Sequence, residues 1–205
     1  MKTDETFVAG ERQRAVRWKA STATLPQPAR QAAPYVNNNG LGSGPAYGFC
    51  LPAEYAELTL LPEVRGQALA LFAELGIPWH AGVGSGPGNH LLSSQVQCVN
   101  ALGQMVHDPE RIVASFGGVV NIESVLEIEP GRFLTFEYIG DSDYLNEARN
   151  GQRTRGAHCT SIDAAFVVRS TDGLTVLVLV EWKYTESYAS RVAEPKDAVR
   201  WSRYS

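Results

Sequence analysis

The sequence predicts an α/β domain in which helices flank a mixed central β-sheet. Two stretches have the apolar spacing of helices, at residues 62–75 and 91–106. They precede three segments with the character of strands, at residues 121–128, 132–139 and 162–183. A chain of 205 residues, 44% of them hydrophobic, is long enough to bury the core of one compact domain.

The first 60 residues differ from the rest because they lack periodicity and carry turn and loop signals, at Pro26, Pro28, Pro34, 37–40 and 42–45. We therefore expect a loop-rich N-terminal arm over residues 1–60 and the single domain over residues 61–205. The arm also holds four basic residues around Trp18, namely Arg12, Arg14, Arg17 and Lys19. Such charge runs are usually solvated.

Residues that favour helix ends mark the predicted helices. Gly76 and Pro78 end the first one, whose apolar stripe consists of Val64, Leu69, Leu71, Phe72 and Leu75. The second follows a glycine-rich stretch at residues 82–88, which lacks the Gly-Lys-Ser/Thr ending of a P-loop. We interpret that stretch as a connector, with a phosphate-binding loop as the alternative. Asp108 as N-cap and Pro109 begin a short third helix that ends near Phe116.

Residues 121–128 and 132–139 predict two strands around the turn Pro130-Gly131. Their acidic residues alternate in part and indicate a side that faces solvent, at Glu123, Glu127, Glu129 and Glu137. The polar residues 140–156 predict a loop or a short helix.

The stretch 162–183 predicts a β-hairpin whose second strand, 174–180, is apolar enough to be buried on both faces. Residues 171–173, Thr-Asp-Gly, suit a three-residue loop with the glycine in the left-handed conformation. That loop pairs Ser170 with Leu174 and places Asp163 directly opposite Glu181, with Lys183 on the same face. A two-residue loop would instead place Asp163 on the other face.

Two facing carboxylates repel each other unless a cation lies between them, and Mg²⁺ prefers oxygen ligands. Asp163 followed by the tripeptide Glu181-x-Lys183 at the end of the next strand resembles the PD-(D/E)XK nuclease superfamily, and within it restriction-endonuclease-like proteins of bacteria. The helix segment His90-Leu91-Leu92-Ser93-Ser94-Gln95 with Asn100, and the stretches 160–163 and 183–186, are also similar.

This resemblance implies a restriction-endonuclease-like core that cleaves DNA with Mg²⁺, or Mn²⁺, as cofactor. Asp163 and Glu181 would be the metal ligands, with the backbone carbonyl of Trp182 as a third, and Lys183 would orient or deprotonate the attacking water. Some superfamily members carry an extra acid on the preceding helix, where this chain has Gln95 or Asn100 to face the site. The alternative is an exposed ion pair between neighbouring strands, with no catalytic role.

The family core normally continues beyond this motif with a helix and a strand, whereas here residues 186–204 predict only a helix interrupted at Pro195. Either the domain is small, or the chain is a shortened version of the domain that lacks its C-terminal elements. The sheet edge left open would favour association with another chain, for example as a homodimer.

A net charge of −4 argues mildly against binding of nucleic acid, but the distribution of charge matters more. A basic group precedes the Asp163 strand, at Arg149, Arg153 and Arg155. Arg153 and Arg155 are candidates for phosphate contacts, as is Gln95 for a contact with the nucleic acid.

Other classes of protein fit poorly. The three cysteines are too few and too widely spaced for a disulfide framework, which favours a reducing cytoplasm. Neither a run of about 18 apolar residues nor a signal peptide is present, so we expect no membrane association. The histidines lack zinc-ligand spacing, and the sequence has no Gly-x-Ser-x-Gly elbow for a serine nucleophile.

The sequence thus favours a metal-dependent nuclease that acts on DNA. The main alternative is a catalytically inactive module of the same fold that binds nucleic acid or has a structural role.

Overall fold

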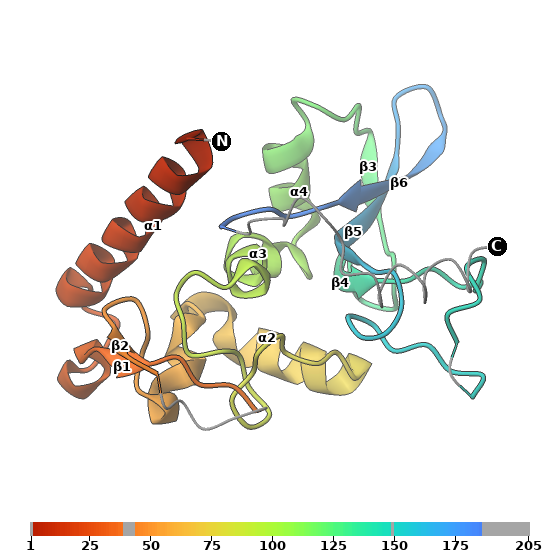
Figure 1. The fold of residues 1–205 in the computed structure, drawn as a ribbon. Coiled ribbons are helices and arrows are strands. Elements are labelled where there is room, and N and C mark those ends of the chain that lie inside the picture. Colours follow the sequence, from red (N-terminus) through yellow and green to blue (C-terminus); the bar gives the residue numbers. More distant parts are fainter. Residues whose placement is uncertain (1, 39–43, 149, 186–205) are drawn as a thin grey trace.

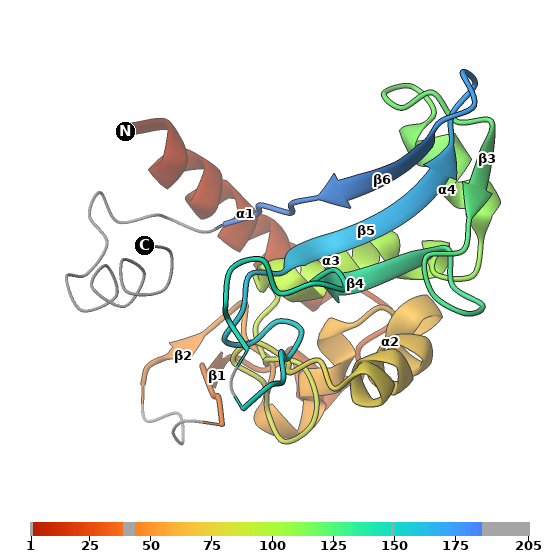
Figure 2. The ribbon, with the colours of Figure 1, turned by 90° about the vertical axis from the view of Figure 1, so that its right-hand side faces the viewer.

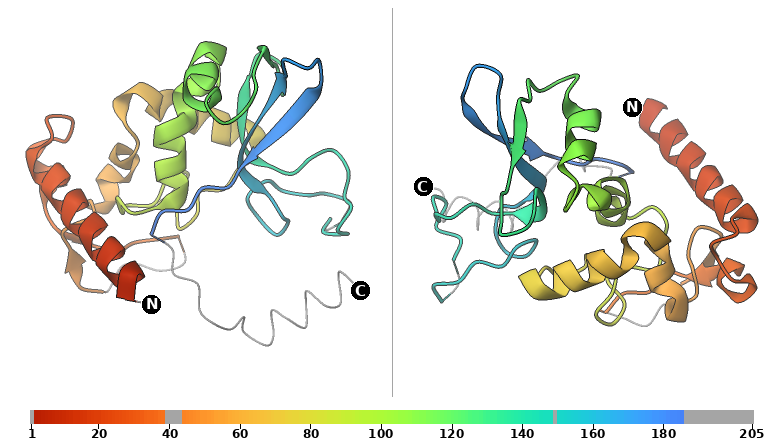
Figure 3. Two further views of the ribbon diagram at one scale, coloured as in Figure 1. Left: turned by 90° about the horizontal axis from the view of Figure 1, so that it is seen from above. Right: turned by 180° about the vertical axis from the view of Figure 1, so that it is seen from behind.

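A computed structural model describes residues 2–38, 44–148 and 150–185 (Figure 1). The α/β fold class is confirmed, with a sheet that carries helices α3 and α4 on one face (Figures 2 and 3). Arg149 and the helix expected over residues 186–204 lie outside the described residues. Within the described ranges, none of the helices combines the length and the apolar content needed to cross a membrane.

The chain begins with a long helix, α1 (Lys2–Ser21), where the sequence predicted loops. Its inner face is held by contacts with distant segments, which sequence periodicity does not reveal. Ala15 packs against Leu91 and Leu92, and the buried ammonium of Lys19 donates hydrogen bonds to the backbone carbonyls of Gln31 and Cys50. Of the four basic residues expected in solvent, only Lys19 is buried; the three arginines are exposed.

Short elements follow α1 and lead to the domain. They are two 3₁₀ segments, η1 (Gln27–Arg30) and η2 (Ala53–Thr59), and a two-stranded ribbon, β1 (Ala33–Pro34) with β2 (Ala46–Tyr47). The glycine-rich stretch 82–88 forms turns. In it the Gly84 N–H donates to the Asn38 side chain, which supports its interpretation as a connector.

The helices match the predicted positions closely. Helix α2 (Pro62–Leu75) ends at Gly76, whose φ of +64° is left-handed, and α4 (Pro109–Phe116) begins with the Asp108 side chain accepting the Arg111 N–H. Helix α3 (Ser94–Leu102) is shorter than expected because Ser93 caps its start and a 3₁₀ turn, η3 (Gly103–Met105), replaces its last turn.

The sheet is organised around β5 (Ile162–Arg169), which pairs on one edge with β6 (Thr175–Val180). Its other edge carries β3 (Ser124–Leu126) and β4 (Leu134–Tyr138), which pair with successive parts of β5 (Figure 2). Every strand pair in the described residues is antiparallel. Phe72 of α2, Phe136 of β4 and Phe166 of β5 are buried between the helices and the sheet.

The hairpin register is the predicted one. Arg169 pairs with Thr175 and Ala164 with Val180, which is the register of a three-residue loop. Gly173 has φ of +85°, and the Ser170 N–H donates to the Leu174 carbonyl at 2.9 Å. Continuing the register by one pair sets Asp163 opposite Glu181.

The prediction that residues 174–180 are buried on both faces is wrong. Among the described residues β6 is an edge strand with alternating exposure, and Val176, Val178 and Val180 face the core. Leu177 and Leu179 point outward and remain 44% and 52% exposed, because no helix of the described residues covers that face of the sheet.

The Gly173 turn gives a test of what fixes the register. Gly173→Ala should destabilise the fold by about 1–2 kcal/mol in urea denaturation, since open space surrounds the added Cβ and only the left-handed backbone opposes it. The matched control is Gly66→Ala inside α2, also in open space, which should stabilise by about 0.5–1 kcal/mol. Equal effects at the two positions would contradict this account of the turn.

Candidate active site

The predicted site residues meet where β5 begins and β6 ends. The Asp163 carboxylate is half-buried, and its Oδ2 accepts the backbone N–H of Trp182 at 2.6 Å. This hydrogen bond continues the β5–β6 pairing past Val180, using a side chain in place of the backbone. It fixes Asp163 beside the Glu181-x-Lys183 segment.

Glu181 and Lys183 share one face of this segment and form an ion pair. Their side chains are about half exposed, at 53% and 51%. An exposed pair of this kind stabilises a protein by only about 0–1 kcal/mol, so little free energy opposes its separation. The Glu181 carboxylate can therefore exchange the ammonium for another cation.

A third carboxylate, Glu137 of β4, acts electrostatically on Asp163 and was not predicted as a site residue. It is 4% exposed, although the alternation of acids placed it on the solvent side. Its φ of +49° is left-handed, and the β4–β5 pairing passes from Phe136 to Tyr138 without it. Such a conformation costs a residue with a Cβ roughly 1–2 kcal/mol and is concentrated at functional sites.

Hydrogen bonds hold the buried Glu137 in place. Its Oε1 accepts from Gln95 Nε2 at 3.0 Å, and its Oε2 accepts from the Ser161 hydroxyl at 2.8 Å. Gln95 also accepts the His80 N–H at 2.8 Å and is itself buried. Gln95 therefore positions Glu137, while the Asn100 side chain bonds the backbone of residues 59 and 61, away from the carboxylates.

The three carboxylates repel one another. The pKa of Asp163 is raised above its ordinary value, first by burial and then by the negative charges of Glu181 and Glu137. The Trp182 N–H and the Lys183 ammonium oppose this rise. Burial, and then the same three carboxylates, also raise the pKa of the Cys98 thiol on α3. One region between β4, β5, β6 and α3 thus concentrates negative charge.

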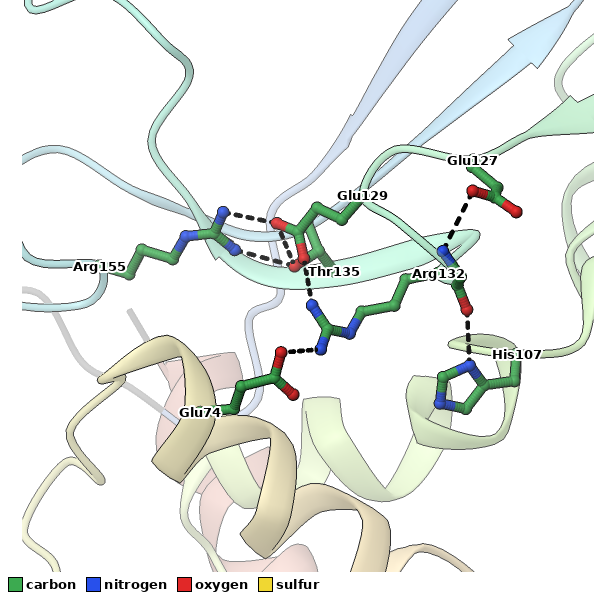
Figure 4. Close-up of polar contacts among 8 residues, drawn as sticks. Glu74, His107, Glu127, Glu129, Arg132, Thr135 and Arg155 are labelled. Carbon is green, nitrogen blue, oxygen red and sulfur yellow. Dashed lines mark hydrogen bonds and ion pairs between the residues drawn. The ribbon is translucent and has the colours of Figure 1, made fainter.

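The two arginines predicted to contact nucleic acid make structural contacts, and Figure 4 shows those of Arg155. Arg155 binds Glu129 and donates to the Thr135 hydroxyl at 2.9 Å, and Arg132 connects Glu129 to Glu74 of α2. Arg153 donates to the backbone carbonyls of residues 139 and 140, at 2.9 Å each. Both guanidinium groups hold loops next to the sheet, and their contacts with nucleic acid stay a prediction.

The oxygen donors at the site suit a hard divalent cation. Mg²⁺ is usually held by one or two carboxylates and keeps several waters, a requirement that Asp163 and Glu181 meet. The Trp182 carbonyl accepts the Ser94 hydroxyl at 3.3 Å and keeps a second lone pair. In the part of the chain that the structure describes, no group of three His, Cys, Asp or Glu side chains is arranged to hold a metal ion. A resident metal would therefore rest on two side chains.

Comparison with known proteins gives one match. The model of a family described as Restriction Endonuclease associating with ARP matches residues 12–204. No curated protein sequence and no solved structure matches the chain. The family match covers almost the whole sequence, includes the carboxylate cluster and α1 from Arg12 onward, and confirms the restriction-endonuclease-like resemblance. The chain belongs to the family of restriction endonucleases associating with ARP.

Proposed function

We propose that this protein is a metal-dependent nuclease that hydrolyses phosphodiester bonds of DNA. Asp163 and Glu181 hold Mg²⁺ or Mn²⁺, with the Trp182 carbonyl as a further ligand. The observation that carries the proposal is the register that sets Asp163 opposite Glu181, with Lys183 on the same face. Family membership supports the nuclease class and the preference for DNA.

The side chains have distinct roles in this proposal. The Trp182 N–H holds Asp163 in one orientation, so that the metal meets a preformed ligand. Lys183 would separate from Glu181 on binding of the cation, and its ammonium would then be available to the attacking water and a phosphate oxygen. A bound divalent ion lowers the pKa of water toward neutrality and offsets charge that develops on the phosphoryl oxygens.

A second candidate is a non-catalytic module of the same fold. The closed Glu181–Lys183 pair favours it, because in that pair the lysine already balances one carboxylate. The family description also names association with ARP, and we include in the proposal a protein partner of that kind or a second copy of the chain. Such a contact would bury Leu177 and Leu179.

The first test compares cleavage of plasmid and linear DNA by wild type, Asp163→Ala and Lys183→Ala, with Mg²⁺ or Mn²⁺. The nuclease proposal predicts metal-dependent cleavage that falls on the order of 100-fold or more in each variant, because each loses a group that stabilises transition-state charge. Arg111→Ala on α4 is the matched control for loss of a cation and should cleave as wild type. Absence of wild-type cleavage with either metal would favour the non-catalytic module.

The second prediction concerns the pH dependence of cleavage. The charge of Glu137 raises the pKa of Asp163, and metal binding needs Asp163 deprotonated. Glu137→Gln should therefore lower that pKa and shift the acidic limb of the pH–rate profile to lower pH. Glu123→Gln, which removes an exposed acid, should leave the limb in place. If the acidic limb of Glu137→Gln is not shifted, the charge of Glu137 does not affect the pKa of Asp163.

The third prediction concerns stability. Because the folded-state pKa of Asp163 is raised, the native protein loses stability as the pH rises from the unfolded value, about 4, through the folded value. Asp163→Asn removes this penalty and should stabilise the metal-free protein at neutral pH by about 0.5–2 kcal/mol, a gain that shrinks as the pH falls toward 4. Thermal unfolding measures the difference.

The control lies in the same hairpin. The Ser170 hydroxyl lowers the pKa of Asp172, so Asp172→Asn should not stabilise the protein. Added Mg²⁺ should raise the melting temperature of wild type and leave that of Asp163→Asn unchanged, since a ligand stabilises only the state that binds it. Destabilisation by Asp163→Asn at neutral pH would mean that the Trp182 hydrogen bond outweighs the repulsion.

A further inference from the structure

A groove of about 590 Å³ lies between α1 and the β1–β2 ribbon and reaches Thr185, two residues after Lys183. Figure 1 shows these elements. Segments far apart in the sequence line it, with the residues Val8, Arg12, Tyr35, Tyr47, Phe49, His90, Leu92 and Thr185. The proposed cleavage chemistry uses none of them. Half are aromatic rings, if the imidazole of His90 is included.

The aromatic rings of the groove pack against one another in pairs and remain accessible to solvent. Tyr47 stacks on Phe49 with ring centroids 5.2 Å apart and an interplanar angle of 25°. Tyr35 meets the His90 ring edge to face at 5.1 Å. Tyr35 and Tyr47 are still 36% and 38% exposed. Ring surface left open in this way can stack against a further flat group.

The charge of the groove suits an anionic ligand. The Arg12 guanidinium lies 5.8 Å from the centroid of the Phe49 ring, and no carboxylate is among the described lining residues. Arg17 adds exposed positive charge to the same helix, whereas the charge of Arg14 is paired with Glu11. Burial lowers the pKa of His90, so its imidazole is neutral at pH 7 and offers a ring with a hydrogen-bonding edge.

The groove is also close to the cleavage site. Thr185 lines it and is fixed by a hydrogen bond from its hydroxyl to the Leu92 carbonyl at 3.2 Å. Thr185 follows Lys183 by two residues, which sets their Cα atoms at most about 7 Å apart. Thr185 therefore connects the lining of the groove to the Lys183 segment, so that one DNA strand can contact both.

We propose that this groove binds unpaired bases of a DNA strand. Bases stack on Tyr47 and Tyr35, and Arg12 neutralises an adjoining phosphate. Paired bases are covered by their neighbours in a duplex, whereas exposed ring faces require bases that are unstacked. The inference rests on the proposed function and adds a substrate class to it: the strand entering the site is single-stranded at this point.

The test uses Asp163→Asn protein in EDTA, so that cleavage does not interfere, and measures anisotropy of a fluorescein-labelled oligothymidylate at fixed salt. We expect tighter binding of this single strand than of a labelled duplex of equal length. Tyr47→Leu keeps an apolar contact with Phe49 but removes the ring, and should weaken binding about 5- to 100-fold. Tyr47→Phe should bind as the parent does. Arg12→Gln should reduce the salt dependence by about one phosphate contact.

The matched control is Tyr144→Leu, since Tyr144 is 88% exposed and lies away from this groove. Equal binding by Tyr47→Leu and the parent, or equal weakening by Tyr144→Leu, would overturn the inference, as would tighter binding of the duplex. Failure of the nuclease proposal is distinguishable. If wild type cleaves no DNA but Tyr47-dependent binding persists, the groove proposal is supported and the nuclease proposal is refuted. If wild type cleaves DNA without Tyr47-dependent binding, the nuclease proposal is supported and the groove proposal is refuted.

Discussion

The register of the β5–β6 hairpin is the constraint on which the candidate site depends. It is set at one end by the left-handed Gly173 and held at the other by the Trp182 N–H bound to Asp163. A shift of one residue would turn Asp163 to the opposite face of the sheet from Glu181. The turn therefore affects the site through the strand pairing: it lies at the other end of the hairpin, and the register that it sets determines which face the Asp163 carboxylate occupies.

The second consequence of this register is electrostatic. It brings Asp163 close to Glu181, and the partial burial of Asp163, together with the charges of Glu181 and Glu137, raises the pKa of Asp163. Lys183 compensates in part by pairing with Glu181. Glu137 is held in a left-handed conformation by Gln95 and Ser161, which adds strain to the repulsion. This arrangement costs stability in the metal-free protein, and in our proposal a divalent cation between Asp163 and Glu181 offsets the repulsion.

The helix ends and the hairpin register could be predicted because their sequence signals are local. The Thr-Asp-Gly turn, the Asp108 N-cap and the Gly76 helix end lie within a few residues of what they determine. Glu137 could not be found in this way, because its burial depends on β4 aligning with β5 and on Gln95 of α3. Helix α1 was not predicted because the contacts that bury its inner face are not local. Its Lys19 donates hydrogen bonds to backbone carbonyls 12 and 31 residues away. The apolar composition of β6 predicts burial on both faces, but its outer face is exposed in the described structure.

In our proposal Asp163 and Glu181 form one cation site with Lys183 beside it. Anomalous diffraction from crystals soaked in Mn²⁺ is a sharp test of this site, because the ion is located without reliance on activity. We expect an anomalous peak bonded to one oxygen each of Asp163 and Glu181, with the Lys183 ammonium displaced from Glu181. Crystals at saturating Mn²⁺ that show no peak there, with the Glu181–Lys183 pair intact, would contradict it.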